Sequence, residues 1–458
     1  MRALPLLFAV LVCLAGAVPS LAQSALPIRC GDLSFEDEVR AAGGQYGTGN
    51  QGALSLLADA GINTVRLRLW HTPAPGRDDL ADVLTAAARA EASGLDVLLA
   101  LHYSDTWADP GQQTKPAAWE RLDTDALGDS VYTYTRAVLT ALRDQGTPPR
   151  YVQLGNEITG GMLWDTGRVG GAFDTPAQWA RLAALLASGR AAVRNALGDD
   201  AIVILHLDRG ADLAGATWFF DRLRPLFADF DVIGLSYYPW WHGDLDAFAA
   251  TLDGLATRYG LPLFVAETGY PWTLGFFDDT NNLVGLPGQL LPGFPASPQG
   301  QADFLAAVAD RVAAVPGGLG VCYWAPDWIA APAFGSAWEN VALFDDAGRL
   351  LPGALVLGGT AVATESTAPQ TWDLTVVAYP NPTARTLTIE TRTGVTRADR
   401  CGRIEVVDRL GRRVAVAESV CGDTPLRLDV SDWAPGVYAV RLSSDDRHTT
   451  VLVTVVPR

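Results

Sequence analysis

Strand-like and helix-like segments alternate along most of this chain, and this alternation restricts the fold more than any other feature. Between about residue 30 and residue 350, short apolar segments are separated by Ala- and Leu-rich segments with helical spacing. The strand candidates are residues 32–35, 62–69, 95–103, 150–157, 201–208, 231–238, 262–268 and 319–325. The clearest helix candidates are residues 79–92, 130–144, 176–196, 245–258 and 300–314. Eight strands separated by helices predict an α/β fold, a (β/α)8 TIM barrel.

A doubly wound open sheet is the alternative fold for the same alternation. Such a sheet would more commonly carry a Gly-rich phosphate-binding turn after its first strand, and the sequence has none there. The barrel is therefore favoured. Long loops rich in Gly, Pro, Trp and Asp follow several strands, and in a barrel they would gather on the face where the strands end. These loops are residues 70–77, 104–119, 160–175 and 270–300.

The composition changes around residue 353. Residues 358–369 contain few large apolar side chains, which is typical of a linker. From residue 372 to residue 458, short alternating segments separated by turn residues predict a small antiparallel β-sandwich. We therefore predict a catalytic barrel over residues 23–352, a linker over 353–371 and an all-β domain over 372–458.

Residues 1–22 have the pattern of a secretory signal peptide. Arg2 supplies the positive charge, residues 4–18 form the apolar segment, and Ser20-Leu-Ala22 offers a cleavage site. The apolar segment is too short for a membrane-spanning helix, and no later segment is long enough to cross a bilayer. We expect a protein that is secreted or displayed at the cell surface, without a membrane span.

The formal net charge of -17 restricts the partners of the protein. Nucleic-acid binding normally requires a basic surface, so no nucleic-acid partner is expected. The same charge would repel anionic membranes and polyanionic substrates. A neutral substrate is therefore favoured.

Cysteine usage fits an exported protein. Apart from Cys13 in the signal segment, the chain has four cysteines, enough for two disulfides. We predict a bond between Cys401 and Cys421, which lie close together in the sequence. For Cys30 and Cys322 the sequence leaves open either a bond or two buried free thiols. No Cys-x-x-Cys or His-x-x-x-His spacing suggests zinc, and no metal ligand is predicted.

Two strand candidates end in glutamates. Tyr151-Val-Gln-Leu-Gly-Asn-Glu157 reads as a buried strand, a tight turn at Gly155 and a polar tip. Leu261-Pro-Leu-Phe-Val-Ala-Glu267 repeats the pattern far downstream. Polar residues at strand tips are the usual way in which a barrel presents its chemistry. Glu157 and Glu267 therefore suggest the paired carboxylates that cleave glycosidic bonds.

Cationic and imidazole side chains accompany these glutamates. Arg66 and Arg68 share one face of the second strand, and buried arginines require carboxylate partners such as Glu157, Glu267 or Asp105. The alternative is a structural ion pair around the barrel rim. Four of the five histidines fall at or just beyond predicted strand ends, and without a short ligand pair they fit sugar-binding donors better than metal ligands. They are His71, His102, His206 and His242.

Aromatic residues crowd the same loops. Trp in loops rich in Gly and Pro is poorly explained by packing alone, and aromatic faces suit the C–H faces of sugar rings. Competing chemistries fit worse. A Schiff-base barrel needs a lysine on a strand, whereas Lys115, the only lysine, lies in a loop. The sequence also lacks the Gly-x-Ser-x-Gly motif of serine hydrolases and any recognisable metal-ligand spacing.

Six motifs fall in order between about residues 30 and 350: Asn63-Thr-Val-Arg-Leu-Arg-Leu-Trp70, His102-Tyr-Ser-Asp-Thr-Trp-Ala-Asp-Pro110, Gln153-Leu-Gly-Asn-Glu157, His206-Leu-Asp208, Ser236-Tyr-Tyr-Pro-Trp-Trp-His-Gly243 and Glu267-Thr-Gly-Tyr-Pro271. Together they resemble, in matching order, the motifs of glycoside hydrolase family 53, the arabinogalactan endo-β-1,4-galactanases of a retaining barrel clan. The resemblance implies a secreted enzyme that cleaves internal β-1,4-galactosidic bonds in galactan or type I arabinogalactan by double displacement. The open alternatives are another retaining β-glycanase of the same clan and a non-catalytic surface glycan-binding protein.

The resemblance also implies roles for individual residues. Glu157 would be the general acid/base and Glu267 the nucleophile, with carboxyl groups about 5–5.5 Å apart as retention requires. Asn156 would bond the sugar 2-hydroxyl, Tyr238 and Arg68 would hold the nucleophile ionised, and Trp324 would form the floor of the sugar site. The other predicted substrate-binding residues are His102, Asp105, His206, Asp208 and Trp240.

No cofactor is expected for this reaction. Some members of the family carry calcium between the loops after strands seven and eight, and residues 276–282 (Phe-Phe-Asp-Asp-Thr-Asn-Asn) offer suitable oxygens for a structural calcium.

The tail has a resemblance of its own. Tyr379-Pro-Asn-Pro-Thr383, Asp408-Arg-Leu-Gly-Arg412 and Trp433-Ala-Pro-Gly-Val-Tyr438 look like the C-terminal sorting domains of type IX secretion substrates. This implies the secretion machinery as a partner of the tail. The alternatives are a carbohydrate-binding module and a passive β-domain, and the scarcity of free aromatics in the tail disfavours the former.

Overall fold

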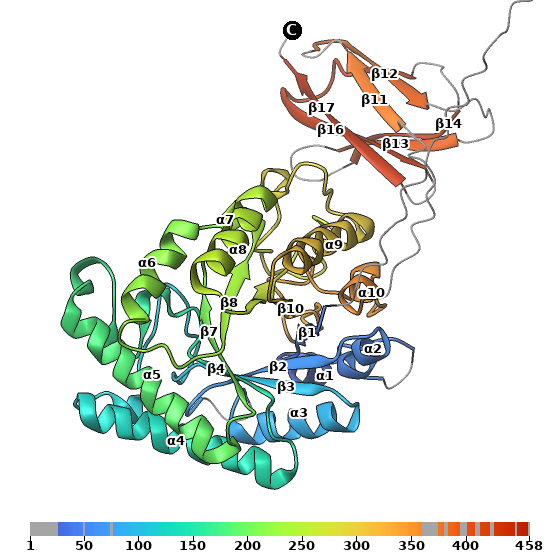
Figure 1. The fold of residues 1–458 in the computed structure, drawn as a ribbon. Helices are drawn as coiled ribbons and strands as arrows, with labels where there is room; N and C mark the ends of the chain where they lie inside the picture. The colour runs from blue at the N-terminus through green and yellow to red at the C-terminus, as the bar shows by residue number, and fades with distance from the viewer. Residues whose placement is uncertain are drawn as a thin grey trace, which may run out of the picture. The chain divides into compact units, whose positions relative to one another are not determined.

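The computed structural model describes residues 26–48, 51–73, 77–359, 374–379, 383–393, 401–407, 413–421, 426–444 and 447–456. The chain divides into two compact units, Met1–Val362 and Ala363–Arg458 (Figure 1). The predicted signal segment, residues 1–22, lies outside the described residues. No helix within the described ranges is long and apolar enough to cross a membrane.

The first unit is a closed barrel of eight parallel strands, which confirms the predicted (β/α)8 fold (Figure 1). Neighbours around the barrel follow the order of the chain, and the last strand pairs with the first. The strands are β1 (Ile28–Asp32), β2 (Thr64–Leu69), β3 (Asp96–Leu101), β4 (Tyr151–Leu154), β7 (Ile202–Leu207), β8 (Val232–Tyr237), β9 (Leu263–Thr268) and β10 (Gly318–Trp324). A short hairpin of β5 (Gly161–Met162) and β6 (Gly167–Arg168) follows β4.

The first strand lies earlier than predicted. β1 covers residues 28–32, whereas the sequence pattern suggested residues 32–35. Leu33 and Phe35 are buried, but they pack in the loop that follows the strand. Buried loop residues and strand residues give the same apolar pattern in the sequence, which explains the difference. The shift matters because it makes Asp32 the last residue of β1, at the level of the other strand tips.

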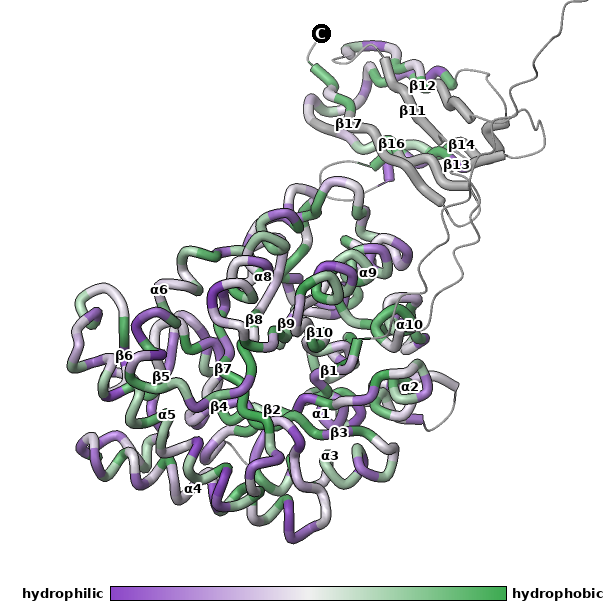
Figure 2. The backbone as a smooth tube through the Cα atoms, in the orientation of Figure 1, coloured by the Kyte–Doolittle hydropathy of each residue, from purple (hydrophilic) through white to green (hydrophobic). Residues whose placement is uncertain are grey.

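Helices surround the barrel, and side-chain caps mark where several of them begin. The carboxylates of Asp79, Asp123 and Asp244 each accept hydrogen bonds from backbone amides in the first turn of the following helix. The colours of Figure 2 alternate along these helices because one face packs on the barrel and the other meets solvent. The helices are α1 (Glu36–Ala41), α2 (Ala53–Asp59), α3 (Leu80–Ala92), α4 (Thr124–Gln145), α5 (Pro176–Leu197), α6 (Leu213–Leu223), α7 (Pro239–His242), α8 (Leu245–Tyr259), α9 (Pro298–Ala314) and α10 (Pro352–Leu357).

Helix α10 covers the start of the predicted linker. Its residues Gly353, Ala354 and Leu357 are buried, and it packs against α9. Residues 352–357 therefore belong to the barrel unit. Most of the remaining predicted linker, residues 360–371, lies outside the described residues.

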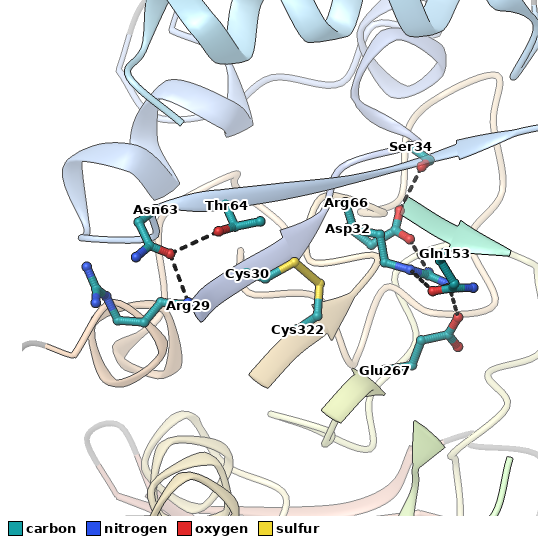
Figure 3. Close-up of a disulfide and its surroundings, with 10 residues drawn as sticks. All are labelled: Arg29, Cys30, Asp32, Ser34, Asn63, Thr64, Arg66, Gln153, Glu267 and Cys322. Carbon is teal, nitrogen blue, oxygen red and sulfur yellow. Dashed lines mark hydrogen bonds and ion pairs between the residues drawn. A yellow bond between two sulfur atoms is a disulfide. The ribbon is translucent and has the colours of Figure 1, made fainter. Parts of the chain in front are cut away.

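A disulfide closes the seam of the barrel. Cys30 on β1 lies directly opposite Cys322 on β10, and the two are bonded across 292 residues of sequence (Figure 3). Both cysteines are fully buried in an apolar cluster formed by residues of several barrel strands, among them Leu98, Ile204 and Phe264. Of the two possibilities that the sequence left open for this pair, the structure shows the bond.

Removing this bond should destabilise the barrel. In the Cys30→Ala/Cys322→Ala double variant we expect the free energy of unfolding to fall by about 2–5 kcal/mol, because the unfolded chain loses a long covalent loop. Urea unfolding followed by tryptophan fluorescence measures the change. A reducing agent should lower the midpoint of the wild-type barrel transition and leave that of the double variant unchanged. Equal midpoints for wild type and double variant would contradict the prediction.

The described residues of the second unit form two small antiparallel sheets, as the predicted all-β sandwich requires. One sheet holds β11 (Leu374–Tyr379), β12 (Thr386–Thr393) and β15 (Leu426–Asp429), and the other holds β14 (Arg413–Cys421), β13 (Cys401–Val407), β16 (Gly436–Ser444) and β17 (Arg447–Val455). Its buried cluster includes Leu387, Ile404, Val440 and Val453. The backbone register places Cys401 opposite Cys421, and their bond stays a prediction.

Candidate active site

Polar and aromatic side chains gather where the barrel strands end. They line a pocket of about 640 Å³, and because the strands are parallel their C-terminal ends all meet there. Eight of the residues predicted from the sequence are brought together in this pocket: Arg68, His102, Asn156, Glu157, Asp208, Tyr238, Glu267 and Trp324. The two glutamates thus face the same cavity.

Glu157 follows β4 in an uncommon backbone conformation. Gly155 has a φ of 77° and Glu157 a φ of 48°, so the chain turns sharply through the left-handed region immediately after the strand. A non-glycine residue in this region is strained, and such strain is often found at functional sites. The turn exposes part of the Glu157 side chain to the pocket, while its Oε1 lies 2.6 Å from the Ser236 hydroxyl oxygen.

Glu267 lies near the end of β9 in a more polar setting. Its Oε1 lies 2.9 Å from a terminal nitrogen of Arg66, and its Oε2 accepts a hydrogen bond of 3.1 Å from the Tyr238 hydroxyl. Only 6% of Glu267 is exposed. The structure thus places the Tyr238 hydroxyl against the Glu267 carboxylate, and its role in keeping the nucleophile ionised stays a prediction.

Arg66 joins the nucleophile candidate to the barrel interior. It pairs with Asp32 at 2.5 Å and donates to the side-chain oxygen of Gln153 at 3.1 Å (Figure 3). It also donates to the side-chain oxygen of Asn156 at 2.8 Å. Arg66 is 1% exposed, so its charge is balanced almost entirely by the two carboxylates that it contacts. This arrangement fixes the position of Glu267.

The two glutamates differ in how readily they ionise. Burial raises the pKa of Glu157 well above its ordinary value, and the neighbouring charge of Glu267 raises it further. Burial also raises the pKa of Glu267 above its ordinary value, but the positive charge of Arg66 and the hydroxyl of Tyr238 offset part of this increase. Glu267 therefore ionises first, and Glu157 keeps its proton to higher pH. One protonated and one ionised carboxyl group facing the same pocket is the arrangement that glycosidases need.

The structure corrects the predicted role of Arg68. Its guanidinium contacts Asp78 at 2.9 Å and lies over the Trp107 ring, 4.1 Å from the centroid, so it does not hold Glu267. Arg66 does so instead. Both arginines share the inner face of β2, but Arg68 lies two residues closer to the strand end and reaches the loops above the barrel. Its Nε and one terminal nitrogen have no hydrogen-bond partner among the described residues, and it still lines the pocket.

Three other predicted substrate-binding residues lie outside the pocket lining. His206 is fully buried, and both ring nitrogens contact side chains of the barrel. The carboxylate of Asp105 accepts hydrogen bonds from the backbone amides of Thr72 and Ala117, which is a loop-stabilising role. Trp240 packs beside Tyr238, whereas the next residue, Trp241, lines the pocket and is 58% exposed.

Sequence reasoning missed Asp32, Gln153 and the contact of Ser236 with Glu157. The sequence pattern predicts a strand that begins at Asp32, whereas β1 ends there. The apolar neighbours of Gln153 predict only that it lies in a buried strand. A polar side chain within a fully buried strand requires a partner, and this rule could have identified Gln153 as part of the polar network.

Tryptophans form much of the pocket wall. Trp107, Trp241, Trp324, Trp328 and Trp338 all line it. Trp324 and Trp338 meet edge to face, with ring centroids 4.8 Å apart, which holds their orientation. Flat aromatic surfaces beside carboxyl groups suit the binding of a sugar chain.

The loop predicted to offer calcium ligands also contacts the loop after β10. Asp278 accepts from the Ser336 amide at 2.7 Å, and Glu339 accepts from the Phe277 amide at 2.7 Å. Among the described residues, Oδ1 of Asn282 and Oε2 of Glu339 are buried without a hydrogen-bond partner. Unsatisfied oxygens of this kind fit a calcium ion, although the described residues contain no cluster of three or more His, Cys, Asp or Glu side chains suited to a metal.

Comparisons with known proteins agree with this geometry. Residues 28–357 match the family model of glycosyl hydrolase family 53, and residues 377–455 match that of the secretion system C-terminal sorting domain. An uncharacterised protein of Niallia circulans is 44% identical over 331 residues, covering 70% of this chain and 90% of that protein. The arabinogalactan endo-β-1,4-galactanase of Cellvibrio japonicus is 38% identical over 334 residues, covering 69% of this chain and 85% of that enzyme.

A solved structure shows the same barrel. The family 53 catalytic domain from Ignisphaera aggregans superposes with a TM-score of 0.67 at 34% identity, covering 75% of this chain and 98% of that chain.

Proposed function

Because this chain belongs to glycosyl hydrolase family 53, we propose that it is an endo-β-1,4-galactanase that retains the anomeric configuration of its substrate. Its relatives over the whole barrel include enzymes named arabinogalactan endo-β-1,4-galactanase. The observation that carries the proposal is the pair of glutamates in one pocket, with Glu267 held by Arg66 and Tyr238 and Glu157 favoured in its protonated form.

In the proposed reaction Glu267 and Glu157 act in two steps. The Glu267 carboxylate attacks the anomeric carbon while Glu157 gives its proton to the leaving glycosidic oxygen, which produces a galactosyl–Glu267 ester and a shortened chain. Glu157, now ionised, takes a proton from water, whose oxygen attacks the same carbon. The ester bond breaks, Glu267 leaves as a carboxylate and Glu157 is protonated again.

The other groups of the site support these steps. Tyr238 and Arg66 stabilise the negative charge of Glu267 before attack and after release. The amide of Asn156, which lines the pocket, is proposed to contact the sugar 2-hydroxyl. The tryptophan walls and the net charge of -17 favour a neutral polysaccharide over an acidic one.

Hydrolysis of potato galactan compared with mannan, xylan and cellulose tests the proposal. We expect turnover on galactan alone, with NMR showing that the first product keeps the β-configuration. The pH profile should be bell-shaped, because Glu267 must be ionised and Glu157 protonated. An α-configured first product would reject the double displacement, and preference for another glycan would reject the substrate. We expect a crystal structure to place the two carboxyl groups about 5–5.5 Å apart, and a separation near roughly 8 Å would reject retention.

Calcium is proposed as a structural ion between the loops after β9 and β10. Asp278, Asn282 and Glu339 would hold it, and its charge would satisfy the unpaired oxygens of the last two. Adding calcium to chelator-treated protein should raise the melting temperature, because an ion that binds only the folded state stabilises it. The Glu339→Gln variant should lose this response. A melting temperature that does not respond to calcium would contradict the proposal.

We propose that the tail directs export through a type IX secretion system. Residues 377–455 match a secretion system sorting domain, which implies secretion or surface display. The predicted N-terminal signal would carry the chain across the inner membrane and the tail would carry it across the outer membrane.

A chain ending at Gly359 separates catalysis from export. This end point keeps helix α10, whose Leu357 is buried. We expect the shortened protein to fold and to keep nearly full turnover on soluble galactan, because every residue of the pocket precedes the cut. In the native host it should remain in the periplasm. Normal export combined with lower activity only on insoluble cell-wall galactan would instead identify the tail as a binding module.

A further inference from the structure

A chain of buried hydrogen bonds runs from Glu157 to Asn156. The Ser236 hydroxyl oxygen lies 2.6 Å from Oε1 of Glu157 and 2.8 Å from Nε2 of His206. On the other side of the ring, Nδ1 of His206 lies 3.0 Å from Oδ1 of Asn156. Ser236 and His206 are fully buried, so each of their protons must be donated within this chain.

Arg66 fixes the direction of the chain at its far end. A guanidinium group only donates, so the Asn156 atom 2.8 Å from Arg66 must be the oxygen. Gln153 donates to the same oxygen at 3.0 Å, and the Asn156 amide nitrogen donates to the Ala108 carbonyl at 2.9 Å. Because Nδ1 of His206 faces an acceptor, it must carry a proton.

The charge state of His206 fixes the next step. Burial lowers the pKa of His206 well below its ordinary value, and the positive charge of Arg66 lowers it further. The ring is therefore neutral, and a neutral imidazole with a proton on Nδ1 has none on Nε2. Nε2 is then an acceptor, and the Ser236 hydroxyl donates its only proton to it.

This leaves the Ser236 oxygen with lone pairs directed at Glu157. Two acceptors 2.6 Å apart would repel each other, so the contact requires a proton on Glu157. If Glu157 were ionised, Ser236 could turn its hydroxyl toward the carboxylate, but Nε2 of His206 would then lose its donor. Otherwise His206 would have to take a second proton beside Arg66. All donors and acceptors match with neutral His206 only when Glu157 is protonated.

We propose that Ser236 and His206 are positioning residues that keep a proton on the general acid Glu157 until the leaving oxygen accepts it. The inference rests on the proposed double displacement, in which Glu157 must begin protonated. Transfer of the proton to the leaving oxygen breaks the match between donors and acceptors. The proton that Glu157 takes from water in the second step restores it, so the chain favours the return of the enzyme to its starting state.

Charged groups around this hydrogen-bonded chain also affect the protonation of Glu157 and His206. Glu267 on β9 and Asp208 after β7 favour protonation of Glu157, and Arg66 on β2 opposes it. His206 is faced by Arg66 and by His242 of α7, and both disfavour its protonated form. Ser236 is the side chain that contacts both Glu157 and His206, so removal of its hydroxyl tests the hydrogen-bonded chain itself.

The Ser236→Ala variant shows whether Ser236 donates to an ionised Glu157 or holds a proton on it. The two interpretations predict opposite shifts of the alkaline limb of the kcat/KM profile. If Ser236 simply donated to an ionised Glu157, its loss would raise the pKa of Glu157 and move the alkaline limb of the kcat/KM profile to higher pH. If the chain holds the proton, the limb moves to lower pH by about one unit, the size expected for one hydrogen bond. Ser236→Thr keeps the hydroxyl and should restore the wild-type limb.

A matched control removes a buried hydroxyl elsewhere. Thr135 is fully buried, and its hydroxyl is hydrogen-bonded to the Tyr103 hydroxyl at 2.8 Å. The Thr135→Val variant should leave the alkaline limb in place. An upward shift for Ser236→Ala, or the same downward shift for Thr135→Val, would overturn the proposal.

A second measurement does not depend on turnover. The full chain has five histidines, so ¹⁵N spectra of histidine-labelled protein can report the tautomer of His206 after assignment with His206→Gln. We expect the proton on Nδ1, and the same tautomer in Glu157→Gln, whose amide is a permanent donor to Ser236. A proton on Nε2 of His206 would overturn the proposed direction of these hydrogen bonds. Failure of the wild type to cleave galactan would instead contradict the proposed function. The tautomer of His206 would still show whether the hydrogen bonds run in the proposed direction.

Discussion

Glu267→Ala and Glu157→Ala are expected to lose nearly all activity on galactan and to be rescued by azide with opposite stereochemistry. Loss of general acid/base catalysis alone lowers the rate by on the order of 10²–10⁴-fold. In Glu267→Ala, azide fits the space left by the nucleophile and should give an α-galactosyl azide. In Glu157→Ala it attacks the galactosyl-enzyme in place of activated water and should give the β-product, best with an activated leaving group.

A buried glutamate outside the pocket provides the control. Glu36 is 4% exposed and accepts from the Leu54 amide, so Glu36→Gln changes a buried carboxylate without touching the pocket wall. It should keep wild-type turnover. Thermal unfolding of all three variants separates loss of chemistry from loss of fold. The reverse stereochemical pattern would exchange the roles of Glu157 and Glu267.

The barrel and the position of its chemistry could be predicted from the sequence because both depend on short-range patterns. Apolar strands alternate with amphipathic helices; Glu157 follows one such strand closely, and Glu267 lies near the end of another. In a barrel of parallel strands, residues at strand ends must share one face, whatever the loops do. This was enough to bring the two glutamates into one pocket without any knowledge of the pairing between distant strands.

The contacts between individual side chains on that face of the barrel could not be predicted as well. Strand periodicity shows that Arg66 and Arg68 point to the same side, but it does not give their height relative to Glu267 on a strand about 200 residues later. That height depends on the stagger between neighbouring strands, which is a property of the closed barrel. Asp32 was missed for a related reason, since β1 ends where a strand was expected to begin.

A long-range contact decided the state of the buried cysteines, and local helix geometry decided which of two tryptophans lines the pocket. The bond between Cys30 and Cys322 depends on β1 meeting β10, which follows only once the barrel closes. For Trp240 and Trp241, the short helix α7 turns adjacent side chains to different sides, so that only Trp241 lines the pocket. Sequence spacing alone does not distinguish two adjacent tryptophans.

Arg66→Met is expected to affect both stability and the pH profile. The substitution leaves Asp32 and Glu267 buried without their cation, and breaking a buried ion pair costs about 3–5 kcal/mol of folding free energy. Arg66 also lowers the pKa of Glu267, so its loss raises that pKa. Because the nucleophile must be ionised, activity should then be lost at higher pH as the solution is acidified. Urea unfolding and the acid limb of kcat/KM measure the two effects.

Two further variants separate the charge of Arg66 from its packing. Asp32 raises the pKa of Glu267, so Asp32→Asn should move the acid limb to lower pH, opposite to Arg66→Met. Arg190 is also buried, at 4% exposed, and pairs with Asp229 and Asp231 away from the pocket. Arg190→Met should therefore destabilise the fold and leave the limb in place. If Arg66→Met and Asp32→Asn shifted the limb in the same direction, Arg66 would act on Glu267 through packing rather than through its charge.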